Sequence, residues 1–160
     1  MTRLVVFDPA LRTTGVAVFV DGVLVDAYAV RVAGRGRGPS VWGEVSATVW
    51  ASLPQGPVDL VAIEAQVVYP HAKADPNDLL QVAGVAGGLA ALARQAGATV
   101  VHFDPAEWKG QVPKDVMAAR AKARLTSVEL AAIRPKSTLD TWDAIGIGLH
   151  YLKGAHRGPT

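Results

Sequence analysis

Three strand patterns follow one another in the first 31 residues, and they restrict the folds that this chain can adopt. RLVVFD at 3–8 and TGVAVFV at 14–20 are short apolar runs typical of buried strands. VLVDAYAVR at 23–31 comes directly after Asp21-Gly22, which is a strong signal for a tight hairpin turn. Because strands joined by such short connections pair antiparallel, we predict that the chain opens with a three-stranded antiparallel meander.

Helical and strand patterns alternate along the rest of the chain. We predict strands at 58–63 and 98–103, and helices at 40–53, 78–96, 113–125 and 138–152, with a short helix that starts at Asp104-Pro105. Ser40 is available as the N-cap of the first of these helices, and Asn77 or Asp78 as the N-cap of the second. The segment 66–78 contains two prolines and is predicted to be a long loop. This order implies an α/β fold: a five-stranded mixed sheet, three antiparallel strands followed by parallel additions, with helices on both faces.

Length and composition indicate one packed domain. The chain has 160 residues, half of them hydrophobic, and we predict a single domain over 1–153 followed by a flexible tail at 154–160. No apolar run reaches the roughly 20 residues of a membrane-spanning helix, and the N-terminus shows no signal-peptide pattern. The absence of cysteine excludes disulfides, thiolate zinc sites and a cysteine nucleophile. We expect a cytoplasmic protein without a membrane partner.

Basic and acidic residues are unevenly distributed, although the net charge is only +2. Residues 39–104 contain two basic and six acidic residues, whereas residues 105–160 contain nine basic and five acidic ones. Local clusters of Lys and Arg, more than net charge, mark a surface that binds nucleic acid. The alternative interpretation is a solvated basic helix face.

Four carboxylates stand at the ends of predicted elements. Asp8 ends the first strand, Glu64 follows an apolar strand, and Asp140 and Asp143 lie one turn apart on the last helix. Burying like charges together raises the pKa of each carboxyl and destabilises a fold unless a cation neutralises them. Carboxylate-rich sites suit hard divalent ions such as Mg²⁺ or Mn²⁺. The residues therefore point to metal-assisted chemistry on phosphate esters.

Each carboxylate also has a structural interpretation. Asp8 can end a strand and cap a turn, and Asp140 can interact favourably with the dipole at the start of a helix. A purely structural role is harder to justify for Glu64 and Asp143, which adjoin strongly apolar stretches. The i,i+3 spacing of Asp140 and Asp143 places both carboxylates on one helix face, which favours a shared site.

Five segments taken together resemble a known family. They are FDPALRTTGVAVF, VAIEAQ, LLQVAGVAGGLAALA, PAEWKGQVPKDVMAARAKARL and DTWDAIGIGLHY. In this order they resemble the ribonuclease H-like fold and, more closely, the RuvC-type Holliday junction resolvases, over nearly the whole chain. Ala10 stands where the family often has glycine, and Val67 stands where an aromatic is common, with Tyr69 as the nearest aromatic. The segment 66–78 also differs from the cellular enzymes, so a phage-type relative is one interpretation. The resemblance thus implies a bacterial or phage-infected cell.

The resemblance implies a role for each of the four acidic residues. Asp8, at the centre of the sheet in this fold, would bridge two Mg²⁺ or Mn²⁺ ions. Glu64 would bind one of these ions from the neighbouring strand, and Asp140 and Asp143 would complete the other side. Two such ions can activate a water molecule, neutralise the phosphoryl oxygens and assist the leaving oxygen.

Further residues are candidates for contact with DNA. Lys109 and Lys114 resemble the DNA-binding and catalytic-support lysines of the family, and either could stabilise charge on the scissile phosphate, with Lys114 counted among the catalytic residues. Tyr69 could stack on a base. The other candidates are basic residues that would follow the phosphate backbone: Arg35, Arg37, Arg120 and Lys122. For each of these, a solvated surface position is the alternative.

The function that this resemblance implies is cleavage of branched DNA. We expect a homodimer that resolves four-way junctions in recombination and repair by paired symmetric nicks, because a two-fold assembly suits a symmetric junction. The small-residue helix at 78–96 is the candidate for part of the dimer interface. One alternative is a nuclease of the same fold that acts on flaps, forks or RNA precursors, and another is a non-catalytic junction binder. An actin-like phosphotransferase would need a second domain, which 160 residues do not hold.

Overall fold

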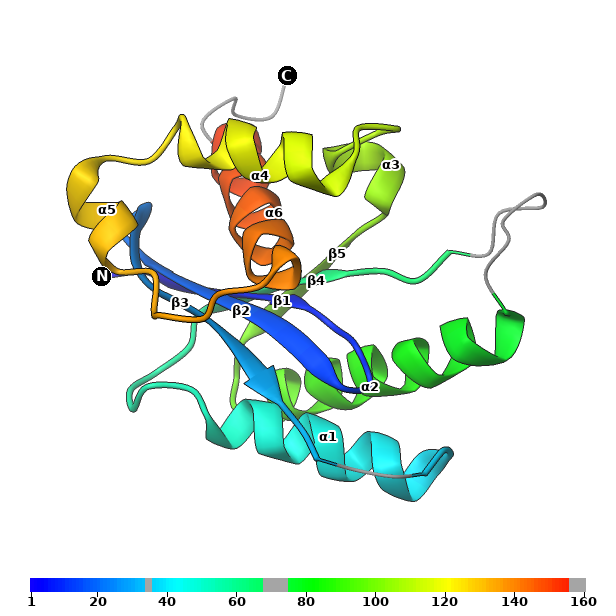
Figure 1. Cartoon of the computed structure of the whole chain (residues 1–160). Helices are drawn as coiled ribbons and strands as arrows, with labels where there is room; N and C mark the ends of the chain where they lie inside the picture. The colour runs from blue at the N-terminus through cyan, green and yellow to red at the C-terminus, as the bar shows by residue number, and fades with distance from the viewer. Residues whose placement is uncertain (34–35, 68–74, 156–160) are drawn as a thin grey trace.

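A five-stranded sheet forms the centre of the protein, with helices on both of its faces (Figure 1). The computed structural model describes residues 1–33, 36–67 and 75–155. The strands are β1 (Arg3–Asp8), β2 (Thr13–Val20), β3 (Val23–Arg31), β4 (Leu60–Glu64) and β5 (Thr99–Phe103). The helices are α1 (Pro39–Ala51), α2 (Pro76–Gln95), α3 (Pro105–Trp108), α4 (Lys114–Lys122), α5 (Ser127–Ala131) and α6 (Leu139–Ala155).

The sheet is mixed, as the sequence predicts. Its strand order is β3-β2-β1-β4-β5. β2 is antiparallel to both β1 and β3, and β4 is parallel to both β1 and β5, so β1 is the central strand. Phe7 of β1 pairs with Ile63 of β4. The next residue on each strand, Asp8 and Glu64, therefore reaches the same edge of the sheet.

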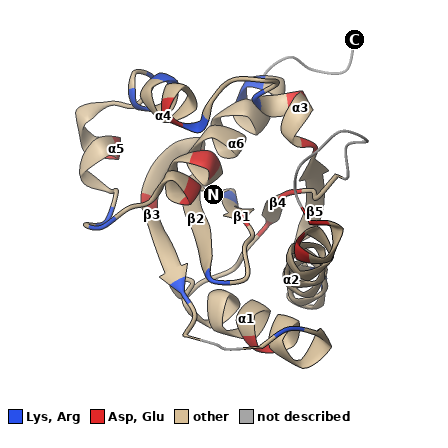
Figure 2. Cartoon of the chain, turned by 45° about the vertical axis from the view of Figure 1, so that its right-hand side comes forward, with Lys and Arg blue, Asp and Glu red and all other residues tan. Residues whose placement is uncertain are grey.

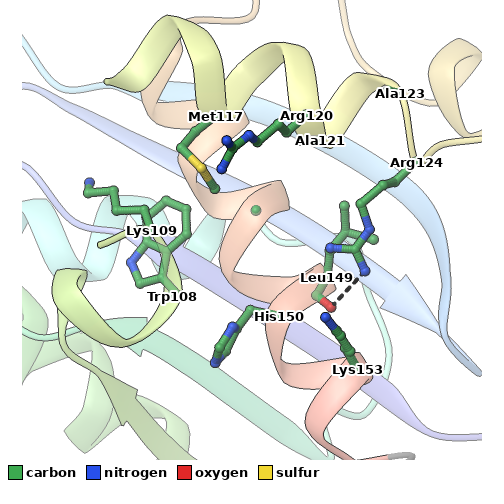
Figure 3. Close-up of a pocket in the computed structure, with 11 residues that line it drawn as sticks. Trp108, Lys109, Met117, Arg120, Ala121, Ala123, Arg124, Leu149, His150 and Lys153 are labelled. Carbon is green, nitrogen blue, oxygen red and sulfur yellow. Dashed lines mark hydrogen bonds between the residues drawn. The ribbon is translucent and has the colours of Figure 1, made fainter. Parts of the chain in front are cut away.

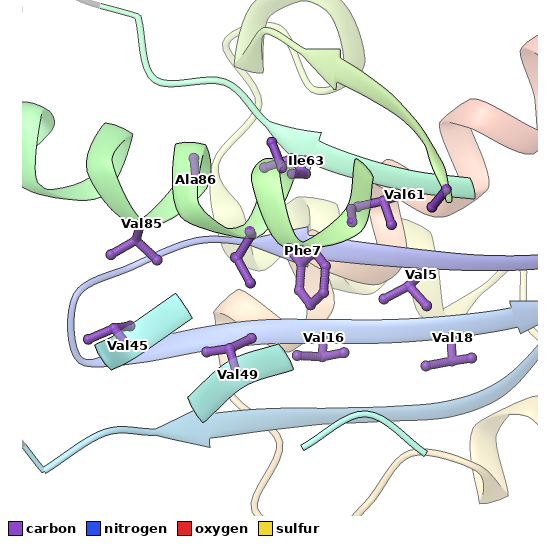
Figure 4. Close-up of a cluster of buried hydrophobic side chains, with 14 of the residues drawn as sticks. Val5, Phe7, Val16, Val18, Val45, Val49, Val61, Ile63, Val85 and Ala86 are labelled. Atoms are coloured by element: carbon purple, nitrogen blue, oxygen red, sulfur yellow. The ribbon is translucent and has the colours of Figure 1, made fainter. Parts of the chain in front are cut away.

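α1 and α2 cover one face of the sheet and enclose a hydrophobic core (Figure 4). Side chains alternate between the two faces along a strand, so every second residue of β1 and β2 contributes to this layer. The core includes Val5, Phe7, Val16 and Val18 of the sheet, Val45 and Val49 of α1, and Val85 and Leu89 of α2. Complete burial of such a side chain stabilises the fold by about 1.5–3 kcal/mol, which holds β1 rigidly in the middle of the sheet.

α6 covers the opposite face, with α3 and α4 beside it (Figure 1). The intervening residues of β1 and β2 point into this second core, where they meet the apolar face of α6. Its buried members include Leu4, Val6, Ala17, Phe19, Ala144, Ile145 and Ile147. The packing fixes the rotation of α6, and its polar first turn lies at the edge of the sheet that carries Asp8.

Two glycines allow α6 to lie very close to the sheet. A Cβ at Gly15 of β2 would overlap the backbone of Asp140, and a Cβ at Gly148 would overlap the ring of Phe19. Gly15 is also the residue that pairs with Asp8 across β1 and β2. The first turn of α6 is therefore held directly beside the end of β1.

Two glycines of α2 pack against α1. A Cβ at Gly84 would overlap the indole ring of Trp42, and a Cβ at Gly88 would overlap the side chain of Ser46, whose Oγ donates a hydrogen bond to the carbonyl oxygen of Val85 at 3.0 Å. The close neighbour that these two small residues admit is a helix of the same chain. Gly87 differs, because it is exposed and a Cβ there would meet nothing within 4 Å.

α5 is an element that the sequence patterns did not indicate. Thr126 and Glu129 form a capping box at its start, and the Glu129 carboxylate also accepts a hydrogen bond from the backbone N–H of Leu24 at 3.1 Å, which ties α5 to β3. Five residues are too few to show helical periodicity. At the C-terminus α6 runs to Ala155, and the rest of the predicted tail lies outside the described residues. No helix in the described ranges is long and apolar enough to cross a membrane.

Candidate active site

Four carboxylates from three elements gather at one edge of the sheet. Asp8 and Glu64 end β1 and β4, and Asp140 and Asp143 lie in the first two turns of α6; acidic positions are red in Figure 2. The exposed fractions are 6% for Asp8, 7% for Glu64 and 1% for Asp143, whereas Asp140 is half-buried. Asp8 experiences the negative charge of all three other groups. The structure therefore brings together the four acids that the sequence analysis selected.

Burial makes full ionisation of this cluster unfavourable. Removal from water, followed by the negative charge of Glu64, raises the pKa of Asp8 well above its ordinary value of 3.8. Burial also raises the pKa of Glu64 above 4.5, while the positive charge of Lys109 acts in the opposite direction. A cluster of this kind needs cations close by if its carboxylates are to be charged at neutral pH.

Two lysines supply positive charge within the cluster. Lys109 Nζ lies 3.5 Å from Glu64 Oε2 and 3.5 Å from Asp143 Oδ2. Lys114 Nζ lies 3.0 Å from Asp143 Oδ2 and 3.1 Å from Asp140 Oδ1. Partial burial disfavours the charge of Lys114, but the carboxylates of Asp8, Asp143 and Asp140 outweigh it and raise the pKa of this lysine. Each ammonium group thus bridges two carboxylates.

Trp108 is a part of the site that the sequence analysis did not select. Its ring is buried, with an exposed fraction of 7%, and its indole N–H donates a hydrogen bond to Glu64 Oε2 at 2.9 Å. The capping box of Asp104 and Glu107 fixes α3, which ends at Trp108 and places Lys109 over the indole, with Nζ 4.7 Å from the ring centroid. A buried tryptophan needs a hydrogen-bond acceptor for its N–H, and this requirement is the signal that could have pointed to a role for Trp108 in the site.

The overall structure is shared with proteins of known structure. No protein-family model matches the sequence, and no curated protein sequence matches it. Thermus thermophilus RuvC in complex with a Holliday junction substrate aligns with a TM-score of 0.72 at 23% identity, covering 100% of this chain and 98% of that chain. The chain has the RuvC fold.

Two further solved structures extend this likeness. A second Thermus thermophilus RuvC structure aligns with a TM-score of 0.69 at 22% identity, over 98% of this chain and 97% of that one. The yeast mitochondrial Holliday junction resolvase Ydc2 aligns with a TM-score of 0.64 at 12% identity, over 95% of this chain and 78% of that one. At these identities the likeness is one of fold, and it confirms the predicted ribonuclease H-like class.

The carboxylates of this RuvC fold have the chemistry of a divalent-metal site. All four offer hard oxygen donors, and Asp143 Oδ1 is buried with no hydrogen-bond partner among the described residues. As the side chains lie, however, no group of three or more His, Asp or Glu in the described ranges is arranged to hold a metal ion. The ammonium groups of Lys109 and Lys114 each contact two of the carboxylates instead. By the chemistry of its oxygen donors the set fits Mg²⁺ or Mn²⁺.

The other predicted DNA contacts are scattered. Arg37 forms an exposed ion pair with Asp78 at 3.1 Å, and both line an open pocket of about 430 Å³ that Asp140 also lines. Arg12, which sequence reasoning did not select, lines the same pocket. Arg120 and Lys122 are exposed on α4. Tyr69 and Arg35 lie outside the described residues.

Proposed function

We propose that this protein is a divalent-metal-dependent endonuclease that resolves four-way DNA junctions by paired symmetric nicks. The observation that carries this proposal is the cluster of Asp8, Glu64, Asp140 and Asp143, three of them buried, with two lysines at one edge of a RuvC-fold sheet. A purely structural cluster would place like charges together at a cost in stability and with no gain. The similar Thermus structure is a complex with a Holliday junction substrate, which supports branched DNA as the substrate here.

The proposed metal ligands are the four carboxylates. Asp8, on the central strand, is the candidate for a ligand shared by two Mg²⁺ or Mn²⁺ ions, with Glu64 on one side and Asp140 and Asp143 on the other. Such ions neutralise phosphoryl oxygens and generate a nucleophile from water. Trp108 holds the Glu64 carboxylate in place through its indole N–H. Lys109 and Lys114 can donate hydrogen bonds to phosphoryl oxygens and stabilise the charge that develops on them.

The proposed assembly is a homodimer, because paired nicks on a two-fold symmetric junction require two active sites. The surface that supports this assembly is the side of α2 turned away from α1. Leu80 is 57% exposed there, and Ala83, Gly87 and Ala91 follow at helical spacing, all exposed. A stripe of small residues beside an exposed leucine suits close packing against a second helix of the same kind.

Cleavage of a labelled four-way junction, with Mg²⁺ or Mn²⁺, tests the proposal. The controls are linear duplex, flap and single-stranded DNA, and the matched variant is Asp8→Asn. We expect symmetric nicks on the junction alone, with activity reduced at least about a hundredfold in the variant, a loss of about 2.7 kcal/mol of transition-state stabilisation.

The controls separate the alternatives. Metal-dependent cutting of flaps, forks or RNA would keep the site and change the substrate. Tight junction binding without cutting under either metal would indicate a non-catalytic junction binder. Full cleavage by Asp8→Asn would remove the metal-site assignment.

A further inference from the structure

A basic pocket lies between α4 and α6 (Figure 3). Its volume is about 430 Å³, within the range of about 300–1,000 Å³ that is usual for small-molecule sites. Arg120, Arg124 and Lys153 surround the opening, and Met117 and Leu149 contribute an apolar floor. The pocket thus combines positive charge at its rim with an apolar interior.

The charge at this rim is not balanced by acidic neighbours. No Asp or Glu lines the pocket, and among the described residues Arg120, Arg124 and Lys153 form no ion pair. Arg120 lies in the last turn of α4, which ends at Lys122, and Arg124 lies two residues beyond that end. The helix dipole favours basic residues at the C-terminus of a helix. It favours Lys122 equally, although Lys122 does not line the pocket.

The pocket and the carboxylate cluster share residues. Trp108 lines the pocket, where its ring packs against Gly146, and its indole N–H reaches Glu64 in the cluster. Lys109 also lines the pocket, and its ammonium group points out of it toward Glu64 and Asp143 (Figure 3). A DNA strand whose phosphate lies at the carboxylates therefore has a neighbouring nucleotide close to the pocket.

We propose that this pocket binds one nucleotide of the cleaved strand. Its phosphate would lie against Arg120, Arg124 and Lys153, and its sugar and base would lie on the floor formed by Met117 and Leu149. The identity of the strand as the cleaved one rests on the proposed function. A nucleotide reaches such a pocket only after it leaves the base stack, which costs least where DNA is branched or unpaired. The pocket therefore favours branched over continuous duplex DNA.

Binding of a labelled single-stranded tetranucleotide to the full-length protein in EDTA tests the pocket, because neither cleavage nor metal then contributes. Arg120→Ala and Arg124→Ala should each weaken binding about tenfold and reduce the slope of log K against log salt by about 0.7, the value for one phosphate contact on a single strand. Arg94→Ala removes the same charge from an exposed position on α2, outside the pocket, and should change neither quantity. Ala123→Phe keeps every charge but fills the opening, and should weaken binding by a similar factor.

Three results would overturn the inference. Equal losses in Arg120→Ala and Arg94→Ala would indicate general electrostatic attraction. Undiminished binding by Ala123→Phe would show that the cavity is not used. Competition by free thymidine monophosphate as strong as that by the unlabelled tetranucleotide would indicate a site for free nucleotides rather than for a strand. Because the tetranucleotide experiment contains no junction, a negative result there concerns the pocket alone. It is therefore distinguishable from a failure of the proposed junction cleavage.

Discussion

At the scale of single residues, the candidate site is a balance between buried carboxylates and two ammonium groups. Asp143 shows this balance most clearly. Its Oδ2 lies 3.0 Å from Lys114 Nζ and 3.5 Å from Lys109 Nζ, while its Oδ1 is buried without a hydrogen-bond partner in the described part of the chain. The two lysines compensate part of the negative charge of Asp143, but they leave its Oδ1 atom free to bind a cation. We infer that the site is built to exchange these contacts for contacts to a metal ion and a phosphate.

Asp8→Asn is expected to raise the melting temperature of the metal-free protein at neutral pH by a few degrees. The pKa of Asp8 is raised in the folded state, so its ionisation opposes folding once the pH exceeds the pKa of the unfolded chain, about 3.9. Below that pH Asp8 is protonated in both states, and the difference between the proteins should disappear. Thermal melts in EDTA from acidic to neutral pH measure this effect. An equal or lower melting temperature at neutral pH would contradict it.

At the scale of elements, proline determines where three helices begin. α1 starts at Pro39 after Gly38, and α2 starts at Pro76 after Asp75, whose side chain accepts a hydrogen bond from the N–H of Asn77. The predicted N-caps Ser40 and Asn77 or Asp78 were therefore wrong, because each lies inside the first turn. Proline suits the first helical position, since its fixed φ is helical and its missing N–H is not needed there. The same rule, applied at Asp104-Pro105, located α3 correctly.

The contact between β2 and α6 determines whether the site assembles. Gly15→Ala should destabilise the protein by about 1–3 kcal/mol, the usual cost of adding a group to filled space, because the new Cβ overlaps the backbone of Asp140. It should also weaken Mg²⁺ binding, since Asp140 and Asp143 move away from Asp8. Urea denaturation and calorimetric titration measure the two effects.

Gly43→Ala is the matched control for this prediction. Gly43 is exposed on α1 and has open space around it, so alanine there should leave Mg²⁺ binding unchanged and add up to about 1 kcal/mol of stability. If Gly15→Ala behaved in the same way, the close approach of α6 would not be what positions the two aspartates.

At the scale of the whole molecule, the sheet separates two kinds of surface. One side carries α1 and α2, which pack tightly together and leave the stripe of Leu80, Ala83, Gly87 and Ala91 exposed. The other side carries α3, α4 and α6, with the carboxylate cluster and the basic pocket next to each other. A dimer formed through α2 would leave the carboxylate cluster of both copies accessible, as the proposed cleavage of a junction at two sites requires.

Gly87→Arg is expected to convert the proposed dimer to a monomer. The monomer fold should be kept, because a side chain at this position meets nothing within 4 Å. Sedimentation velocity measures the change in mass, and paired nicking should give way to single nicks. Glu44→Arg, an exposed reversal of charge on α1, is the control and should remain dimeric. A wild-type protein that is monomeric and still makes paired nicks would contradict the assembly.

The sequence alone determined the order of the strands and of the longer helices, and the positions of the four acids within them. Apolar runs and helical periodicity are local properties, so Asp8 and Glu64 could be placed at strand ends and Asp140 and Asp143 on one helix face. The family resemblance then placed these acids in one site. Short elements such as α5 could not be predicted, because capping contacts and a hydrogen bond to β3 stabilise it rather than a periodic pattern.

Only the tertiary structure decided which side chains meet within the site. Trp108 donates to Glu64 across 44 residues of sequence, and Lys114 contacts Asp140 across 26. No local pattern encodes such pairs, because they depend on how α3, α4 and α6 pack on the sheet. The basic pocket has the same origin, since its rim combines residues from α4, the segment after it and α6. Local chemistry selected the acids, and long-range packing selected their partners.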